Sequence, residues 1–268
     1  MGFIKDVWGG HDYIPRVWDS WFKQKDAKMF VVLVGGAPVG MNRIRFMEDG
    51  TAWLEGARVH PGFRGQGLAT ALGNNSMEVA RERGIKLLRL TSGSRNLHAH
   101  HQIARMGFRE ASRFSIYSPS ETLELDPEQG VRRLGPRDFE RVHGSITSSQ
   151  EFALGSGVMW DTFAAVELTP GVIRKALTQR RVYSVKTALA IAKEGGEGEV
   201  WNQVCFVTGT GEGVIRLAKH IFSGNGKRKA DWRLVYLPQG SSLIGEMRRA
   251  GFEREFSHVL YSRETPKG

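Results

Sequence analysis

The sequence predicts an α/β (α+β) protein built from two similar halves. Strand-like runs alternate with helix-like runs along the chain, and a glycine-rich loop leads from one strand directly into a helix. In addition, residues 103–118 resemble residues 247–262. At 268 residues, of which 40% are hydrophobic and 25% charged, the chain is long enough for two domains with separate cores.

The first half is expected to contain five strands around one long helix. The strand-like runs are residues 29–34, 39–46, 51–59, 85–90 and 114–117. The first two of these runs flank Gly35-Gly36-Ala37-Pro38, which predicts a hairpin. Residues 68–83 place apolar side chains on one helical stripe and are followed by Gly84, a typical residue just beyond a helix end.

The loop Arg64-Gly65-Gln66-Gly67-Leu68-Ala69 joins the third strand to the long helix. Two glycines at a helix start expose several backbone N–H groups in one small concavity, which attracts phosphate oxygens. The loop lacks the Lys-Ser/Thr ending of a nucleotide triphosphatase and the three glycines of a dinucleotide-binding enzyme. We therefore interpret it as a pyrophosphate cradle, against the alternative of an ordinary turn.

Read as Arg-x-x-Gly-x-Ala after Val59-His60-Pro61, this loop resembles the coenzyme A loop of the GNAT superfamily of N-acetyltransferases. Asn96, eleven residues before Gly107-Phe108, resembles the second coenzyme-contacting segment of that family. The resemblance covers residues 10–118 and implies a mixed, mostly antiparallel sheet flanked by helices, with acetyl-CoA as cosubstrate and no metal. The coenzyme-binding residues that it implies are Ala57, Arg58, Val59, Arg64, Gly65, Gln66, Gly67, Leu68, Ala69, Thr70 and Asn96.

An aromatic segment near the N-terminus offers an acceptor pocket. The stretch Gly-His-Asp-Tyr-Ile-Pro-Arg, followed by Trp18-Asp-Ser-Trp21-Phe22, weakly resembles the subgroup that contains histidine N-acetyltransferase. We therefore expect Tyr13 and Trp18 to bind the acceptor substrate, although an aromatic stripe on a helix also suits a plain hydrophobic core.

Glu55 is the candidate general base. An ammonium acceptor must lose a proton before its nitrogen attacks a thioester, and a carboxylate can take that proton. Glu55 shares one face of its strand with Trp53 and Ala57, so we expect it to be partly desolvated. The alternative is a structural salt bridge with Arg43 or Arg45.

The general acid is where the sequence departs from the family. The family commonly carries a tyrosine four residues before the Gly-Phe pair, and that position is Ile103. His100 lies three residues earlier, on roughly the same helical face, and is the substitute candidate. Water could protonate the thiolate instead, or the chain could be a weak sensor of acetyl-CoA. The cluster of His98, His100 and His101 lacks further ligands at metal-site spacing.

The second half repeats the first without its coenzyme chemistry. An offset of 251 − 107 = 144 pairs Gly107-Phe108 with Gly251-Phe252 and Tyr117-Ser118 with Tyr261-Ser262. The expected elements are strands at 182–185, 187–192, 200–207 and 232–237 and a helix near 214–222. In place of the coenzyme loop stands Thr208-Gly-Thr-Gly-Glu-Gly213, which puts Glu212 against any phosphate.

We therefore expect two domains, a catalytic GNAT domain at residues 1–122 and a degenerate GNAT-like domain at residues 123–268. The boundary is placed in a polar, turn-rich segment that runs from Ser118 to Gly130. The alternative is that the second half is an unrelated α+β domain with a coincidental Gly-Phe turn.

Composition favours a cytoplasmic enzyme. The chain has no membrane-spanning run, no secretory leader pattern, and one cysteine, Cys205, inside a strand-like segment. The net charge of +10 is spread in short clusters, which favours a solvated basic exterior over a nucleic-acid surface.

We thus predict a monomeric or homodimeric N-acetyltransferase that moves an acetyl group directly from acetyl-CoA to a small-molecule or peptide primary amine. The alternative is an acetyl-CoA-binding pseudoenzyme, or a basic adaptor for nucleic acid or the ribosome.

Overall fold

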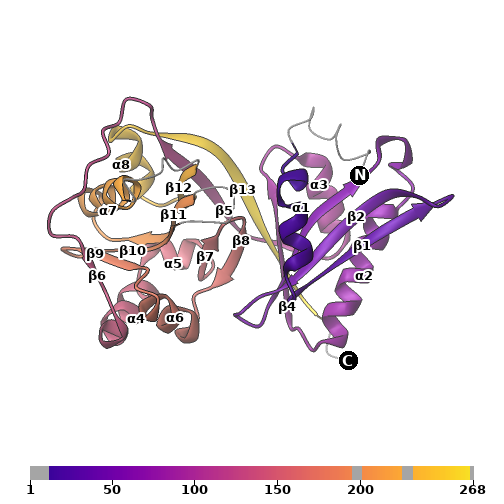
Figure 1. Ribbon diagram of the computed structural model, residues 1–268, viewed down its shortest axis with the longest axis horizontal. Coiled ribbons are helices and arrows are strands. Elements are labelled where there is room, and N and C mark those ends of the chain that lie inside the picture. The colour runs from indigo at the N-terminus through magenta and orange to yellow at the C-terminus, as the bar shows by residue number, and fades with distance from the viewer. Residues whose placement is uncertain (1–11, 195–200, 225–231, 266–268) are drawn as a thin grey trace. The chain divides into compact units, whose positions relative to one another are not determined.

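The computed structural model describes residues 12–194, 201–224 and 232–265, which divide into two compact units (Figure 1). Unit 1 holds the described residues up to Thr91, the segment Asn96–Arg109 and the chain from Tyr261 onward. Unit 2 holds Ser92–Arg95 and Glu110–Leu260. The two units are considered separately.

Unit 1 is a mostly antiparallel sheet with helices. Its elements are α1 (Ile14–Lys23), β1 (Ala27–Val34), β2 (Ala37–Phe46), β3 (Ala52–Val59), the 3₁₀ turn η3 (Pro61–Phe63), α2 (Leu68–Glu82), β4 (Leu87–Gly93) and α3 (Leu97–Arg105). The strand order is β1-β2-β3-β4-β13, in which β3 and β4 run parallel. The hairpin predicted at Gly35–Pro38 is confirmed, because β1 and β2 pair antiparallel on either side of it.

Helix α2 is fixed to the sheet by apolar packing and by one buried amide. Leu72 and Ala80 are buried on its inner face. The Asn42 side chain on β2 donates hydrogen bonds to the Leu72 carbonyl oxygen at 3.0 Å and to Ser76 Oγ at 2.9 Å. These contacts position the N-terminus of α2, and with it the preceding glycine loop, relative to the strands.

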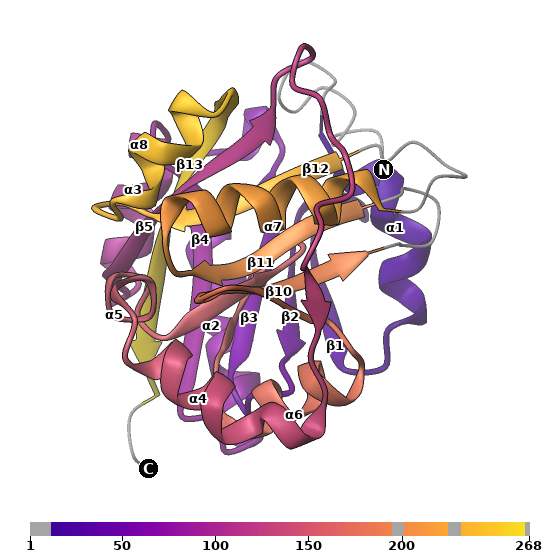
Figure 2. The same cartoon turned by 90° about the vertical axis from the view of Figure 1, so that its left-hand side faces the viewer.

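Unit 2 repeats this plan with additional elements. They are β5 (Arg109–Pro119), β6 (Arg132–Arg133), η4 (Pro136–Asp138), α4 (Phe139–Thr147), α5 (Gln150–Leu154), β7 (Val158–Asp161), β8 (Ala164–Glu167), α6 (Pro170–Thr178), β9 (Val182–Val185), β10 (Ala188–Glu194), β11 (Trp201–Thr208), α7 (Gly211–Ser223), β12 (Trp232–Pro238), α8 (Leu243–Arg249) and β13 (Phe252–Glu264). The strand order is β13-β5-β12-β11-β10-β9-β6, and β7 and β8 form a separate hairpin. Figure 2 shows α7 lying across β10 and β11, where its apolar face forms the main core.

Strand β5 of the first repeat lies almost wholly in unit 2, and the end of strand β13 of the second repeat lies in unit 1. Strand β5 follows α3 in the chain, yet it pairs antiparallel with β12, with Tyr117 opposite Val235. Strand β13 begins in unit 2, and its last residues, from Tyr261, belong to unit 1 beside β4. There the Thr265 N–H donates to the Lys86 carbonyl oxygen at 2.9 Å. Strands of each sequence repeat therefore contribute to both compact units. The functional domain boundary at residue 122 stays a prediction.

The predicted fold class is confirmed as an α+β mixed sheet, but the sequence analysis missed several elements, among them α5, α6 and the β7–β8 hairpin. Helix α6 had a readable start: Thr169 caps it by accepting a hydrogen bond from the Val172 N–H at 3.3 Å, and Pro170 stands at its first position. Among the described helices, none combines the length and the apolar character that crossing a bilayer requires.

Candidate active site

The glycine loop of unit 1 opens onto free space. Gly65 and Gly67 have φ of +78° and +77°, a left-handed backbone that favours glycine. A Cβ atom at either position would meet nothing within 4 Å. The loop is shaped by its own preceding turn, in which His60 Nδ1 accepts a hydrogen bond from the Gly62 N–H at 3.1 Å.

The same loop ends at the N-terminus of α2, where Gly67 is the N-cap. The first N–H groups of a helix have no partner inside the helix and carry the positive end of its dipole. Loop residues 64–67 are exposed, and the first helical N–H groups follow directly. The predicted coenzyme residues 64–70 thus comprise an exposed glycine loop and the first turn of a helix, an arrangement that suits a phosphate group.

The ladder between β3 and β4 ends before the two strands do. Their parallel ladder runs from Ala52 opposite Leu88 to Leu54 opposite Leu90. Strand β3 nevertheless continues to Val59, and β4 continues to Gly93. Glu55 is therefore the first residue of β3 beyond the ladder, so the predicted base and Ala57, Arg58 and Val59 follow the point where the strands separate.

An irregularity in β3 follows Glu55 directly. Gly56 has a φ of +68°, and the register between β2 and β3 shifts in this region. A Cβ atom on Gly56 would lie 2.7 Å from the Trp21 ring. Trp21 of α1, which the sequence analysis did not select, is thus the aromatic side chain that packs on this irregularity.

Glu55 is held by two arginines. It forms an ion pair with Arg43, whose side chain is 2% exposed, and Arg45 Nε lies 3.6 Å from the same carboxylate oxygen. Burial lowers the pKa of Arg43, and the charge of Glu55 opposes that shift. The Arg43 guanidinium also lies over the Trp21 ring, 4.7 Å from its centroid. The salt bridge that was the alternative to a catalytic role is therefore present.

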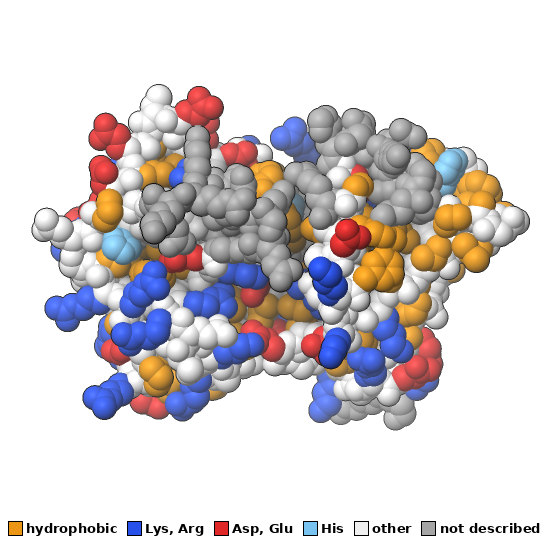
Figure 3. Space-filling model, viewed as in Figure 1, with side chains coloured by type: hydrophobic (Ala, Val, Ile, Leu, Met, Phe, Trp, Pro, Cys, Tyr) orange, Lys and Arg blue, Asp and Glu red, His pale blue; other side chains and the backbone are white. Residues whose placement is uncertain are grey.

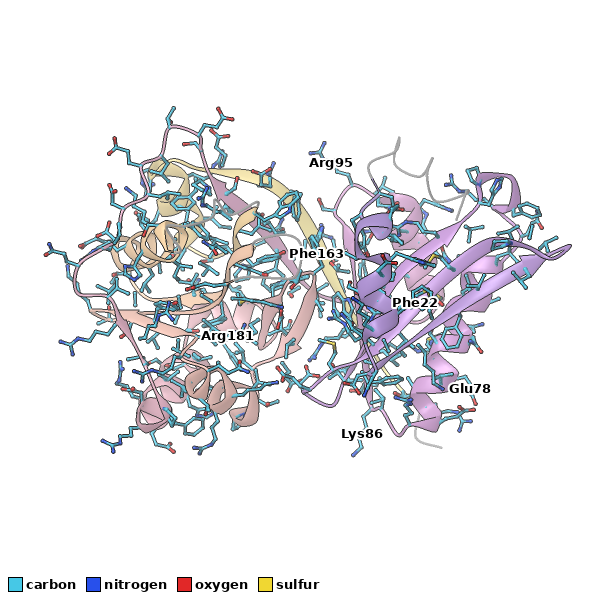
Figure 4. All side chains as sticks on the ribbon, in the orientation of Figure 1. Phe22, Glu78, Lys86, Arg95, Phe163 and Arg181 are labelled. Carbon is cyan, nitrogen blue, oxygen red and sulfur yellow. The ribbon has the colours of Figure 1, made fainter. Side chains whose placement is uncertain are left out.

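Tyr13 lies in the electrostatic environment of Glu55, whereas Trp18 lies further along α1. Burial raises the pKa of Tyr13 to about 12, and the charge of Glu55 is the next largest cause. Trp18 packs edge-on against Phe22, whose side chain is exposed (Figure 4). The side chain of Arg58, a predicted coenzyme contact, is paired with Asp12 at 2.7 Å. Its guanidinium is therefore already paired with a carboxylate, and its backbone lies opposite Met41 in the β2–β3 ladder.

Helix α3 holds the predicted acid and the second coenzyme residue. Asn96 is its N-cap and accepts a hydrogen bond from the Ala99 N–H at 3.2 Å. Ile103, at the position of the family's tyrosine, is buried. His100 Nδ1 lies 2.8 Å from the hydroxyl of Tyr261, and the two rings meet edge to face at 88°. The tyrosine whose hydroxyl contacts α3 thus belongs to β13, whereas the family commonly carries this tyrosine on α3.

The corresponding glycine segment of unit 2 is filled by the protein. A Cβ on Gly211 would lie 2.4 Å from Glu246 Cγ, and one on Gly213 would lie 2.6 Å from Ala188 Cβ. The carboxylate of Glu212 faces outward to Lys186 at 3.0 Å. The glycines of this segment therefore permit internal packing, in contrast to the open cradle of unit 1.

Within the described ranges, no group of three His, Cys, Asp or Glu side chains is arranged to hold a metal ion.

The first part of the chain is similar in sequence to known acetyltransferases. Residues 4–108 match the model of the acetyltransferase (GNAT) family. Over 108 residues the chain is 32% identical to a histidine N-acetyltransferase of Xenopus tropicalis, which covers 38% of this chain and 33% of that protein. Over 114 residues it is 32% identical to an uncharacterized N-acetyltransferase of Methanocaldococcus jannaschii, covering 37% of this chain and 48% of that one. The matching region thus spans between a third and a half of these relatives.

Solved structures resemble the whole chain. A GCN5-related N-acetyltransferase from Sphaerobacter thermophilus aligns over 95% of this chain and 86% of its own, with a TM-score of 0.59 and 16% identity. An acetyltransferase structure from Pyrococcus horikoshii aligns over 99% of this chain and 84% of its own, with a TM-score of 0.60 and 13% identity. At these identities the likeness concerns the fold, and it is consistent with two GNAT-like domains in tandem.

Proposed function

Because residues 4–108 carry a domain of the GNAT acetyltransferase family, we propose that the protein transfers the acetyl group of acetyl-CoA to a primary amine, with unit 1 as the catalytic unit. One observation carries this proposal. The two glycines of the unit 1 loop face open space at a helix N-terminus. The glycines at the equivalent place in unit 2 face packed side chains.

In this proposal, acetyl-CoA supplies the acetyl group and the thiol leaving group. The N–H groups of residues 65–70 bind the pyrophosphate, and Arg64 adds a charge at the loop entrance. The Glu55 carboxylate takes the proton that the acceptor ammonium must lose, while Arg43 and Arg45 keep the carboxylate in place. In its protonated form, His100 gives the Nε2 proton to the departing thiolate and is left as a neutral imidazole with a proton on Nδ1. The hydrogen bond with Tyr261 supports this role because it fixes the imidazole ring through Nδ1.

The acceptor is proposed only as a class. The aromatic rings of Tyr13 and Trp21 and the carboxylate of Glu55 suit a small amine or a peptide amine. Free histidine is the first acceptor to test, because matching relatives are named histidine N-acetyltransferases.

A second candidate function is binding of acetyl-CoA without transfer. The pairing of Glu55 with Arg43 and the buried Ile103 favour it, because both weaken the expected acid and base machinery. The measurement that separates the two candidates is release of free thiol from acetyl-CoA in the presence of histidine, other amino acids, polyamines and peptides. Thiol release that depends on an amine supports transfer, and binding without release supports the pseudoenzyme.

The coenzyme site is tested by substitution in the loop. Gly67→Val introduces a branched side chain at a left-handed position from which a phosphate is expected to approach. The matched control is Gly50→Val, since Gly50 also has a positive φ, of +80°, with no atom within 4 Å of its Cβ position. We expect calorimetry to show acetyl-CoA binding lost in Gly67→Val and kept in Gly50→Val, with both proteins folded by circular dichroism. Unchanged affinity in a folded Gly67→Val protein would end the coenzyme assignment.

A further inference from the structure

Unit 2 contains a basic pocket that the proposed acetyl transfer does not use. Its cavity volume is about 350 Å³. It lies at the ends of β9 and β10 and at the turn that follows α6. The charged side chains that line it are Arg133, Arg180, Arg181, Lys193 and Glu194. Lys and Arg side chains gather on the surface in this region (Figure 3).

Two of the four cationic side chains that line the pocket form an ion pair with a carboxylate. Glu194 pairs with Arg133 at 3.3 Å, and Asp161 pairs with Lys193. For Arg180 and Arg181 there is no carboxylate within 4.0 Å among the described residues. Neither guanidinium therefore has an ion-pair partner among the described residues, although the charge of Arg180 helps to lower the pKa of the nearby Asp138 carboxyl.

Arg181 is fixed in place by neutral groups. Its Nε donates to the Ala192 carbonyl oxygen at 2.8 Å, and one Nη atom lies 3.8 Å from Cys205 Sγ (Figure 4). Burial raises the pKa of the Cys205 thiol to about 12, so the sulfur carries no charge at neutral pH. The side chain is therefore preorganised without being neutralised, as an arginine that receives an external anion should be.

Arg180 stands where a helix end normally has glycine. It follows the C-cap residue Gln179 of α6 and has a φ of +55°. The Arg180 N–H donates to the Leu177 carbonyl oxygen at 3.0 Å, and the Arg181 N–H donates to that of Ala176 at 2.9 Å. This is the Schellman arrangement, in which glycine avoids the strain of the left-handed backbone. An arginine at this position keeps the strain and adds a charge to the pocket, which is the pattern expected of a binding residue.

We propose that this pocket binds a small ligand that carries a phosphate group, with Arg180 and Arg181 as its phosphate-binding residues. Arginine matches phosphate geometry through paired N–H donors. A cavity of about 350 Å³ suits a small molecule, because ligand pockets usually fall between about 300 and 1,000 Å³. Tyr183 and Glu194, joined by a hydrogen bond at the pocket wall, offer polar contacts for hydroxyl groups of the ligand. This inference is independent of acetyl transfer in unit 1.

The test uses the full chain and the variant Arg180→Gly. Glycine relieves the left-handed backbone, so the melting temperature is expected to stay the same or rise while the charge is lost. Inorganic phosphate and pyrophosphate are titrated against protein labelled with ¹⁵N-arginine, and the Nε–Hε signal of Arg181 is followed by NMR. We expect a saturable shift in the wild-type protein and about tenfold or more weaker binding in Arg180→Gly, a loss of about 1.4 kcal/mol.

The matched control is Arg248→Gln, which removes one exposed charge of unit 2 outside the pocket. It should bind phosphate like the wild-type protein. The proposal is overturned if phosphate binding weakens equally in both variants, or if the Arg181 signal shows no saturable shift. A single-stranded oligothymidylate is titrated in parallel. If it binds more tightly than pyrophosphate in a manner that depends on Arg180, a nucleic-acid surface replaces the small-ligand site.

Discussion

Glu55 illustrates how one residue can serve both stability and chemistry. It is the first residue of β3 beyond the β3–β4 ladder, where a ligand could approach, and it is also the partner of the buried Arg43. An isolated guanidinium in the interior is costly, so the pair depends on both members. The sequence analysis identified both possibilities for this carboxylate. The structure shows the ion pair, and the catalytic role stays a proposal.

Replacing Glu55 by Gln should therefore have two measurable effects. Turnover should fall by about 10²–10⁴-fold with the acidic limb of the rate profile flattened, because a positioned base is lost. The free energy of unfolding should fall by about 3 kcal/mol, because Arg43 loses its buried partner. The affinity for acetyl-CoA should change little.

Steady-state kinetics and thermal unfolding check these effects. The control is Glu78→Gln, which breaks an exposed pair with Arg81 on α2 and should leave both quantities unchanged. A loss of turnover below about fivefold, under the usual range for a general base, would leave Glu55 with a structural role only.

Tyr261 is a positioning residue in the proposed mechanism, because it acts through His100. Removing its hydroxyl in Tyr261→Phe should lower kcat by about tenfold or more, while KM for acetyl-CoA stays the same. The double variant with His100→Ala should be no slower than His100→Ala alone, because both changes interrupt one interaction. Tyr117→Phe is the control, since the repeat pairs Tyr117 with Tyr261 and Tyr117 lies in β5 of unit 2. Additive effects, or an equal loss in Tyr117→Phe, would remove Tyr261 from the mechanism.

At the scale of elements, the sequence predicts local features such as turns and helix starts, but it does not predict which distant strands pair. The glycines, the helix start after Gly67 and the hairpin at Gly35–Pro38 depend on nearby residues, so the sequence predicts them directly. The contact of Trp21 with Gly56 and the reach of Tyr261 to His100 join segments far apart in the chain. The alignment of the two repeats paired Tyr117 with Tyr261. The hydrophobic periodicity of a strand, however, does not predict which sheet the strand joins.

Strand β13 also carries a pH-sensitive side chain in unit 2. His258 packs near Trp160 and Phe256, and burial lowers its pKa to about 4, against about 6.5 in an unfolded chain. The folded state therefore favours the neutral ring. The stability that His258 contributes is present above pH 6.5 and is lost progressively as the pH falls to about 4.

We expect the melting temperature of unit 2 to fall between pH 6.5 and pH 4, and the fall to be smaller in His258→Phe. Phenylalanine is the residue at the equivalent position of the first repeat, Phe114, so its shape suits the strand. The control is His143→Phe on α4. A pH dependence that is identical in wild type and in His258→Phe would show that His258 does not cause it.

At the scale of the whole molecule, the exchange of strands ties the chain's end to unit 1. Tyr261 bonds His100, Arg263 donates to the Met106 carbonyl oxygen, and the Thr265 N–H donates to that of Lys86. These residues are 139 or more positions beyond residue 122, where the first functional domain was predicted to end (261 − 122 = 139). We propose that the second half acts as a scaffold for the first, in part by supplying this strand.

A fragment of residues 1–122 should therefore be insoluble or inactive. Without β13, β4 becomes an unpaired sheet edge in unit 1, and such edges promote aggregation. Expression, solubility and thiol release of the fragment are compared with those of the full chain. A soluble fragment with full activity would contradict the scaffold.

The central claim is that unit 1 alone holds acetyl-CoA, and the number of acetyl-CoA sites per chain tests it most directly. Calorimetric titration of the full chain should give one site, and the Gly67→Val variant should give none. The open glycines of the unit 1 loop and the filled glycine segment of unit 2 predict this result. Two sites per chain, or one site that persists in Gly67→Val, would contradict the account and make Thr208–Gly213 a functional loop.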